Sequence, residues 1–373
     1  MSPSQTDVPG QATEPELERP RHPTPDWDSL TFAFTQTDAM YRSFGEFKDD
    51  KTAADSDAEV EWDAGTFVPF RDLNISAASA FMSYGVGIFE GLKAQYSADG
   101  RVLLFRHRDN GLRFQRSAER LMMATFPVDQ FVEAVEELVR KNMRFIPPHG
   151  KGTLYVRPIQ HAIETKLGLG PCSKFWVLMY CSPVGGYFAS KDSKGPSGVR
   201  LRVLRQGRVA PGGTGDAKAM GNYAGGIAIA QKWRAQGYND VLYLDAHELR
   251  YLTETSGSNV FVKLKSGPVV TPPLDDQILP GITRDSAATV AREVLGLDVQ
   301  ERPLPIEEVL DEGEEMFCTG TAWTVQSVSE LVHEDGTHKF QSTEIQEALL
   351  GEIRSYQTGE KEDPFGWVTE VKE

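Results

Sequence analysis

The sequence contains little cysteine, no long apolar run and no excess of positive charge. Three cysteines in 373 residues, at Cys172, Cys181 and Cys318, cannot form a complete disulfide framework, and no pair of them has the spacing of metal ligands. No segment approaches the roughly 18 consecutive apolar residues that a membrane span needs. The net charge of −15 disfavours nucleic-acid binding, because such a surface repels a phosphate backbone. We therefore expect reduced thiols, no metal site, no membrane partner and no nucleic-acid partner.

The beginning of the chain also lacks the features of a targeting segment. It contains several prolines and acidic residues, and it has neither the apolar stretch of a signal peptide nor the arginine-rich, acid-poor composition of a transit peptide. From this composition and the unpaired thiols we predict a cytoplasmic protein with a disordered N-terminal tail over residues 1–28.

The length and composition are those of a globular chain with two domains. The residues are 40% hydrophobic and 25% charged, a balance typical of a folded protein with a sizeable core. The region around residues 185–198 is rich in glycine, proline and serine and interrupts the regular elements. We predict a small N-terminal domain over 29–184, a linker over 185–198 and a larger C-terminal domain over 199–373.

Both halves mix apolar alternation with helical periodicity, which predicts an α+β or α/β fold. Helices are expected at 109–123, from 129 towards the prolines at 147–148, at 222–236, at 283–295 and at 343–355. Strands are expected at 31–34, 102–105, 153–160, 175–181, 199–204, 240–244 and 259–264, with the last two paired to each other.

The segment GGTGDAKAMGNY places Lys218 among small residues, which let the backbone approach a flat ligand closely. A lysine is usually a solvated surface charge, but a lysine held in such surroundings can lose its proton and form a Schiff base with an aldehyde. The segment is not a P-loop, because no Gly-Lys-Ser/Thr occurs in it, and it lacks the G-x-G-x-x-G of a dinucleotide fold. Lys218 is therefore the candidate carrier of an aldehyde cofactor.

Three further features suit the same chemistry, and each has a simpler interpretation. Glu254 is either an exposed strand-end carboxylate or the partner of the pyridine nitrogen of pyridoxal phosphate. Ile282 and Thr283 begin a helix whose free N–H groups can bind phosphate, although a threonine that only caps its own helix is common. Arg157, which shares a strand face with Tyr155, is either solvated or holds a carboxylate. These residues leave both pyridoxal-phosphate chemistry and an unrelated anion-binding enzyme open.

Seven motifs occur in an order that resembles the branched-chain amino-acid aminotransferases, which are fold-type IV pyridoxal-phosphate enzymes. The resemblance covers roughly residues 30–359, and the long N-terminal segment and the PVGGYF element look closest to the mammalian-like branch. The motifs are YGVGIFEGLKA (84–94), FRHRDNGLRFQRSAERL (105–121), LYVRP (154–158), GGTGDAKAMGNY (212–223), LTETSGSNVF (252–261), PPLDDQILPGITR (272–284) and Gly320-Thr321-Ala322 after Thr319.

The resemblance implies a role for each matching residue. Lys218 matches the lysine that carries the cofactor and moves the α-proton of the substrate. The other cofactor residues implied are Tyr223 at the phenolic oxygen, Glu254 at the pyridine nitrogen, and Arg113, Ile282, Thr283 and Thr321 at the phosphate. The substrate residues implied are Tyr84, Phe89, Tyr155 and Arg157 around the side chain, and the main chain of Thr321 and Ala322 at the α-carboxylate.

The resemblance also implies reversible transamination of L-leucine, L-isoleucine and L-valine with 2-oxoglutarate, which yields branched-chain 2-oxo acids and L-glutamate. The implied fold has two domains with pyridoxal phosphate at their interface, in a homodimer. Trp323 and Gln326 stand where mammalian members carry a cysteine pair that acts as a thiol switch. The alternatives are an aminotransferase of another preference, such as D-amino acids, an aminodeoxychorismate lyase, and a catalytically silent regulator that binds pyridoxal phosphate.

Overall fold

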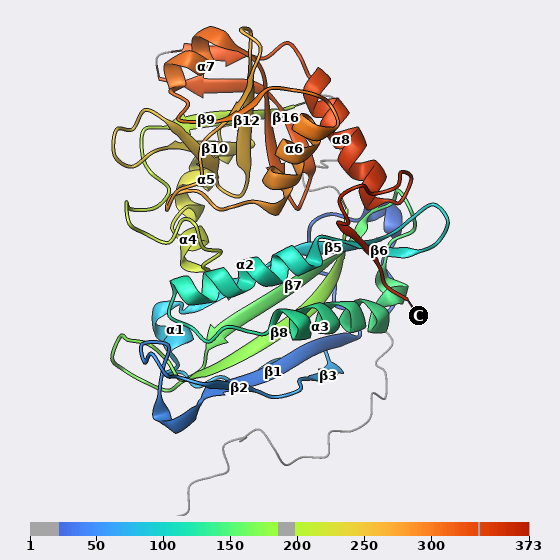
Figure 1. The fold of residues 1–373 in the computed structure, drawn as a ribbon, viewed down its shortest axis with the longest axis vertical. Coiled ribbons are helices and arrows are strands. Elements are labelled where there is room, and N and C mark those ends of the chain that lie inside the picture. Colours follow the sequence, from blue (N-terminus) through green and yellow to red (C-terminus); the bar gives the residue numbers. More distant parts are fainter. Residues whose placement is uncertain (1–21, 186–197, 335, 373) are drawn as a thin grey trace, which may run out of the picture.

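The structure, a computed structural model, describes residues 22–185, 198–334 and 336–372. Its strands form two sheets, which occupy the lower and the upper part of the molecule in Figure 1. The expected linker over 185–198 lies outside the described residues except for its two end residues, and so does most of the expected tail over 1–28.

The first sheet is built from the N-terminal half together with the last strand of the chain. Its order is β18-β6-β5-β7-β8-β1-β2, with β3 beside β1 and β4 beside β7, and every pairing is antiparallel. The strands are β1 (Ala39–Phe47), β2 (Val60–Trp62), β3 (Thr66–Pro69), β4 (Gly87–Phe89), β5 (Leu92–Tyr96), β6 (Val102–Phe105), β7 (Thr153–Ala162), β8 (Lys174–Val184) and β18 (Val368–Glu370).

Two helices cover one face of this sheet (Figure 1). The apolar sides of α2 (His107–Arg120) and α3 (Val128–Lys141) share a core with Leu154 and Val156 of β7. Because side chains alternate along a strand, Arg157 stands on the opposite face of the sheet. The two faces of β7 therefore differ, with a packed core on one side and candidate substrate residues on the other.

The second sheet closes into a barrel of six strands. β9 pairs in parallel with β10 and β16, while β10–β11, β11–β12, β12–β15 and β15–β16 are antiparallel. The pairing of Glu254 with Asn259 joins β11 to β12 and closes the ring. The strands are β9 (Val199–Leu204), β10 (Asp240–Leu244), β11 (Leu252–Thr255), β12 (Asn259–Leu264), β15 (Gly313–Gly320) and β16 (Thr324–His333), extended by β13 (Val269–Thr271), β14 (Val299–Glu301) and β17 (Gly336–Lys339).

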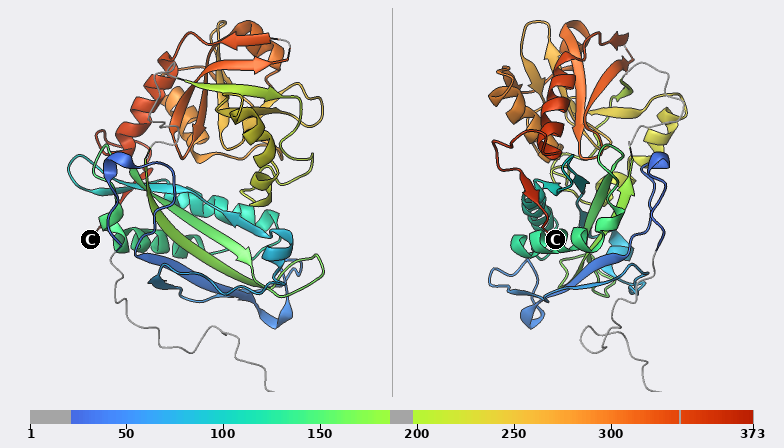
Figure 2. Two further views of the ribbon diagram at one scale, coloured as in Figure 1. Left: turned by 180° about the vertical axis from the view of Figure 1, so that it is seen from behind. Right: turned by 90° about the vertical axis from the view of Figure 1, so that its right-hand side faces the viewer.

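Two helices of the C-terminal half pack against the barrel, and the chain then returns to the first sheet (Figure 2). α6 (Ile282–Glu293) and α8 (Glu344–Gln357) share an apolar cluster with the barrel strands, and β18 pairs with β6.

Among the described residues, no helix is both long enough and apolar enough to cross a membrane. The shorter helices are α1 (Ala80–Tyr84), α4 (Gly221–Ala224), α5 (Ile227–Arg234) and α7 (Ile306–Glu312), with 3₁₀ turns at Trp27–Ser29, Lys48–Asp50 and Met143–Phe145.

Three expected elements differ from the structure. Residues 31–34 form no strand: the carbonyl of Thr31 accepts from the N–H of Gly185, but the N–H of Ala33 bonds to the side chain of Thr31 instead of a neighbouring strand. The helix expected over 222–236 divides at Gly225 and Gly226 into α4 and α5, since glycine is a weak helix former. β10 and β12 are not paired with each other, because β11 lies between them. The other six expected strands form, whereas strands such as β1 and β15 had not been expected, and the expected pairing of β10 with β12 is wrong.

Candidate active site

The candidate cofactor residues meet in one cavity between the two sheets. Helix α2 lines the cavity from the first half of the chain, and four segments of the second half complete it. These segments are the lysine loop before α4, the β11–β12 turn, the start of α6 and the β15–β16 turn. All seven residues expected at the cofactor line the cavity: Arg113, Lys218, Tyr223, Glu254, Ile282, Thr283 and Thr321.

Lys218 lies in a segment whose backbone is anchored to the first half of the chain. Its N–H donates to Ser117 Oγ at 3.0 Å, and its carbonyl accepts from the N–H of Phe89 at 3.1 Å. The neighbouring Ala219 is buried, and its small side chain allows this close approach to β4. The lysine side chain enters the cavity, where Nζ lies 3.2 Å from Tyr223 Oη and 4.7 Å from the ring centre of Phe89.

Glu254 is buried inside the cavity instead of standing at an exposed strand end. Its carboxylate lies 2.5 Å from Arg208 Nη2 and accepts from Asn259 Nδ2 and the N–H of Leu279, both at 3.3 Å. Burial raises the pKa of Glu254 to about 7, although the charge of Arg208 lowers it. Arg208 was not expected from the sequence. Its one signal was its place in the same glycine-rich stretch as Lys218.

The start of α6 presents backbone donors to the cavity. The helix begins at Ile282 after the N-cap Gly281, and no side chain of the described residues caps it. Thr283 is therefore not the helix cap that the sequence left open. The first N–H groups of a helix lack partners within the helix, and the helix dipole favours an anion beside them. A side chain at Gly281 would collide with Asn259, so only glycine allows this approach.

Arg113 provides the cationic wall opposite α6. Its guanidinium pairs with the fully buried Glu90, with Nε–Oε1 at 2.7 Å and Nη2–Oε2 at 2.8 Å, and Nη1 donates to Pro280 O at 3.1 Å. Burial alone would raise the pKa of Glu90, but Arg113 outweighs burial and lowers it, which keeps the pair charged. Three of the five guanidinium N–H groups are used in this way, so two remain for a ligand. Glu90 was also missed at the sequence level, although it lies within a quoted motif.

A larger cavity of about 580 Å³ adjoins Lys218 and Tyr223. Within it, Arg157 Nη2 lies 3.2 Å from Tyr155 Oη, and the guanidinium carbon lies 5.0 Å from the ring centre of Phe89. The expected substrate residues Phe89, Tyr155, Arg157, Thr321 and Ala322 all line this cavity.

Tyr84 lies apart from the other expected substrate residues. It belongs to α1, its side chain is partly exposed, and its hydroxyl donates to the carbonyl of Leu167 at 2.5 Å. Tyr84 lines neither of the two cavities. The geometry of one chain therefore does not bring Tyr84 to the substrate residues.

A closed barrel beside an antiparallel sheet, with a lysine cavity between them, agrees with a known class of enzyme. Residues 87–331 match the family described as Amino-transferase class IV. The chain therefore belongs to the class IV aminotransferases, and the two-domain fold expected from the motifs is confirmed.

Within this class the chain is a branched-chain-amino-acid aminotransferase by family. It is 38% identical to branched-chain-amino-acid aminotransferase 5, chloroplastic, of Arabidopsis thaliana over 352 residues, which cover 93% of this chain and 80% of that protein. It is 39% identical to branched-chain amino acid aminotransferase 2, chloroplastic, of Humulus lupulus over 350 residues, 93% of this chain and 81% of that protein. The solved branched-chain aminotransferase of Thermoproteus uzoniensis has a TM-score of 0.71 at 29% identity, covering 82% of this chain and 97% of that one.

The cytoplasmic location expected from the sequence is wrong by these comparisons. Both plant relatives are chloroplastic proteins, and a third, branched-chain amino acid aminotransferase 1 of Humulus lupulus, is mitochondrial. The expectation rested on the composition of the first residues and on three unpaired thiols, and the thiols show only that no disulfide is needed. Reduced thiols do not distinguish one reducing compartment from another.

Proposed function

We propose that this chain catalyses reversible, pyridoxal-phosphate-dependent transamination of L-leucine, L-isoleucine and L-valine with 2-oxoglutarate. The family supports this reaction, and one observation carries it. The amine of Lys218, the buried carboxyl of Glu254 and the start of α6 line a single cavity. These three groups match the aldehyde, the pyridine nitrogen and the phosphate of the cofactor, respectively.

The cavity also contains polar atoms that such a ligand would satisfy. Thr319 Oγ1 and Arg208 Nε are buried and have no hydrogen-bond partner among the described residues. Buried polar atoms without a partner are rare in proteins and call for an explanation. A Cβ atom at Gly257 would meet open space, so the β11–β12 turn leaves room for a flat ring. The residues present therefore fit pyridoxal phosphate.

Bound pyridoxal phosphate supplies an electron sink for the α-carbon of the substrate. In the proposed reaction, Glu254 holds a proton at the pyridine nitrogen, and Lys218 Nζ carries the α-proton of the substrate. The hydroxyl of Tyr223 would hydrogen-bond the phenolic oxygen. Arg113, Thr321 and the N–H groups of Ile282 and Thr283 would hold the phosphate.

The adjoining cavity suits two unlike side chains in turn. The rings of Phe89 and Tyr155 give leucine, isoleucine and valine an apolar wall, while glutamate brings a second carboxylate that must be paired when it is buried. Arg157 lies at this wall, and its buried Nε has no hydrogen-bond partner among the described residues, so it has donor capacity to spare. The α-carboxylate is assigned to the main chain of Thr321 and Ala322.

We also propose that the enzyme is a homodimer. Leu167 and Leu169 are 90% and 78% exposed, and the Tyr84–Leu167 hydrogen bond joins their loop to α1, where Met82 is also exposed. A cluster of exposed apolar side chains commonly marks an interaction surface. The exposed position of Tyr84 agrees with a substrate pocket that a second copy completes.

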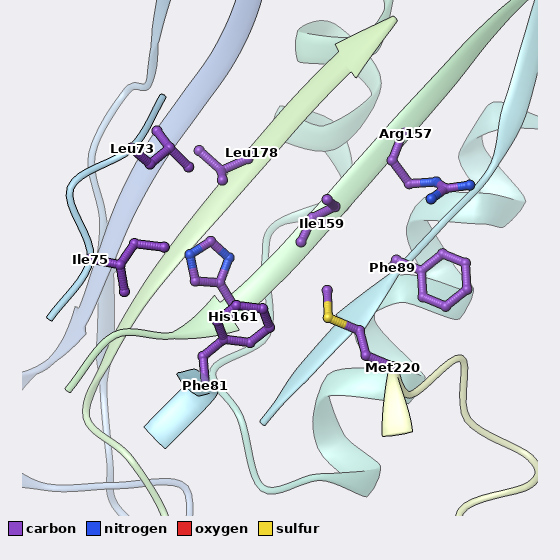
Figure 3. A pocket seen from close by; sticks show the side chains of 9 residues that line it. All are labelled: Leu73, Ile75, Phe81, Phe89, Arg157, Ile159, His161, Leu178 and Met220. Atoms are coloured by element: carbon purple, nitrogen blue, oxygen red, sulfur yellow. The ribbon is translucent and has the colours of Figure 1, made fainter. Parts of the chain in front are cut away.

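An apolar cavity of about 410 Å³ beside α1 supports the same proposal (Figure 3). Phe81, Ile159 and Leu178 line it on the sheet face away from α2 and α3, and it reaches Phe89 and Arg157 at its other end. A second copy seated on this face would cover apolar surface next to the substrate cavity.

Light scattering after size exclusion should give twice the mass of the chain, and Leu167→Glu should shift the protein towards the monomer.

The division of the chain into domains over 29–184 and 199–373 is part of this proposal. Two separate sheets support it, with the change from one to the other falling at residues 185–198. The strand Val368–Glu370 does not follow this division, because it lies in the C-terminal part of the sequence but pairs with β6 of the first sheet.

A half-reaction screen tests the proposed function. The purified protein is loaded with pyridoxal phosphate, and its absorbance is followed after addition of single L- and D-amino acids, without a second substrate. We expect a spectral change with L-leucine, L-isoleucine, L-valine and L-glutamate. A faster change with D-leucine would indicate a D-amino-acid aminotransferase, and pyruvate release from aminodeoxychorismate would indicate the lyase. Bound cofactor that responds to none of these compounds would indicate a silent regulator.

A further inference from the structure

Arg106 connects β6 to α2, and both its backbone and its side chain are held in place. Its φ of 55° lies in the left-handed region, which a side chain of this size rarely adopts. Its N–H donates to the carbonyl of Trp367 at 2.7 Å, and its guanidinium lies 4.9 Å from the ring centre of Trp367. Nε donates to Asp109 at 2.5 Å. The guanidinium is therefore fixed in one direction.

That direction leads to the first turn of α6. Nη1 of Arg106 lies 2.7 Å from Asp285 Oδ2, 2.9 Å from Ser286 Oγ and 3.4 Å from the carbonyl oxygen of Ile282. All three partners belong to the helix whose start lines the proposed cofactor cavity. Arg106 itself lines neither of the two active-site cavities.

Arg113 holds the same segment from within α2. Arg106 is the N-cap residue of that helix, and Arg113 lies about two turns further along it. Nη1 of Arg113 donates to Pro280 O at 3.1 Å, just before the N-cap Gly281. Helix α2 therefore holds the start of α6 from both sides, with Arg113 before the N-cap and Arg106 after it.

The charge of Asp285 gives Arg106 a second effect on this site. Asp285 lies in the first turn of α6, where a carboxylate repels a phosphate bound at the helix start. The ion pair with Arg106 offsets that negative charge. The loss of Arg106 would thus both loosen the first turn and leave the negative charge of Asp285 on that turn without this ion pair.

We propose that Arg106 is a positioning residue for the phosphate site. Arg106 fixes the position of the first turn of α6 relative to Arg113, and it offsets the charge of Asp285. It therefore strengthens the binding only of ligands that carry a phosphate. The proposal rests on the cofactor site proposed above.

The test compares cofactor forms with and without a phosphate. The full chain is freed of cofactor and titrated with pyridoxal phosphate and with pyridoxal, and binding is followed by absorbance. For Arg106→Met we expect the Kd for pyridoxal phosphate to rise about tenfold, the size of one hydrogen bond to a charged group. The Kd for pyridoxal should change by less than about twofold.

Arg108→Met is the matched control. Arg108 belongs to the same helix and makes an exposed ion pair with Asp129 at 2.8 Å, away from α6. This variant should leave both dissociation constants at the wild-type value. The comparison separates a general loss of positive charge on α2 from the specific contact that Arg106 makes.

Two outcomes would overturn the proposal. One is a folded Arg106→Met protein that binds pyridoxal phosphate as the wild type does, and the other is an equal loss for both ligands. If Arg106→Met does not fold, Arg106→Lys decides in its place, because it keeps the charge but loses the forked contact. The proposal would then be overturned if the ratio of the two dissociation constants in Arg106→Lys equals the ratio in the wild type. A wild-type protein that binds neither ligand would instead contradict the proposed function.

Discussion

Glu254 and Arg208 form an ion pair inside the active-site cavity, with 2.5 Å between Oε1 and Nη2. Both side chains are almost completely buried, and burial outweighs the pairing, so the pKa of Glu254 rises to about 7. The carboxyl group can therefore exchange its proton near neutral pH. The ionised form of this carboxyl group can stabilise a protonated ring nitrogen placed beside it.

Lys218→Ala should abolish transamination. Lys218 is the only lysine among the described residues that lines the cofactor cavity, and the loss of a positioned acid–base group commonly costs about 100- to 10,000-fold in rate. Steady-state assays with leucine and 2-oxoglutarate measure the effect. Lys232→Ala is the control, because Lys232 is exposed on α5. A Lys218→Ala enzyme with near wild-type turnover would show that Lys218 has another role.

Glu254→Gln should bind pyridoxal phosphate but react about 100-fold more slowly. A neutral amide cannot stabilise a protonated pyridine nitrogen, so the electron sink weakens. Cofactor binding is measured by absorbance and the rate by single turnover with leucine. Glu248→Gln, at an exposed residue, should retain the wild-type rate. An unchanged rate in Glu254→Gln would make Glu254 an ordinary buried carboxylate.

The stability of the cofactor-free protein should fall with rising pH because of Glu254. Its folded-state pKa of about 7 lies above the ordinary glutamate pKa of 4.5, so the folded chain binds the proton more tightly than the unfolded chain does. The resulting stabilisation is complete below the lower pKa and is lost as the pH rises through the higher one, by an amount on the order of 3 kcal/mol. Urea unfolding of wild type and Glu254→Gln at several pH values measures this. Parallel pH profiles would contradict it.

Arg157→Gln should impair glutamate more than leucine. Only glutamate brings a second carboxylate that needs a charged partner, and a hydrogen bond to a charged group contributes about 1.5–3 kcal/mol, or roughly 10- to 150-fold in kcat/KM. Half-reactions with the two amino acids give the ratio directly. Equal losses for both would place Arg157 at the α-carboxylate or in a purely structural role.

The enzyme should lack a thiol switch. Trp323 and Gln326 stand where the cysteine pair of mammalian members would be, and all three cysteines of this chain are unpaired and buried. Burial raises the pKa of Cys318 to about 12, so little reactive thiolate forms. Mild peroxide should therefore leave activity unchanged with or without dithiothreitol. A reversible loss that disappears in Cys318→Ser would reveal a switch through that thiol.

Residues in a distinctive local setting could be identified from the sequence, whereas residues that depend on long-range contacts could not. Lys218 lies among small residues and Glu254 within a quoted motif, and both line the cavity where they were expected. Arg208 and Glu90 matter because they are buried against other charged groups, and burial of that kind exists only once the two sheets are together. Arg208 lies in the glycine-rich stretch and Glu90 in a motif, but neither position by itself indicates a buried ion pair.

The same distinction holds for the fold. The range 199–204 was expected as a strand and forms β9, but its parallel pairing with β16 joins segments far apart in the chain. Alternating apolar residues indicate that a segment is a strand, but they do not indicate which other strand it pairs with. The pairing of β9 with β16, without which the barrel would stay open, was therefore not predictable from the pattern.

The pairing of β18 with β6 has a consequence for synthesis of the chain. Val368–Glu370 completes a sheet whose other strands all lie before residue 185. At a translation rate of about 5–20 residues per second, β6 waits roughly 10 to 50 seconds for this partner to leave the ribosome. During that interval one edge of the N-terminal sheet stays unpaired and Arg106 lacks the Trp367 carbonyl that fixes its turn. The N-terminal half is thus made first but reaches its final form last.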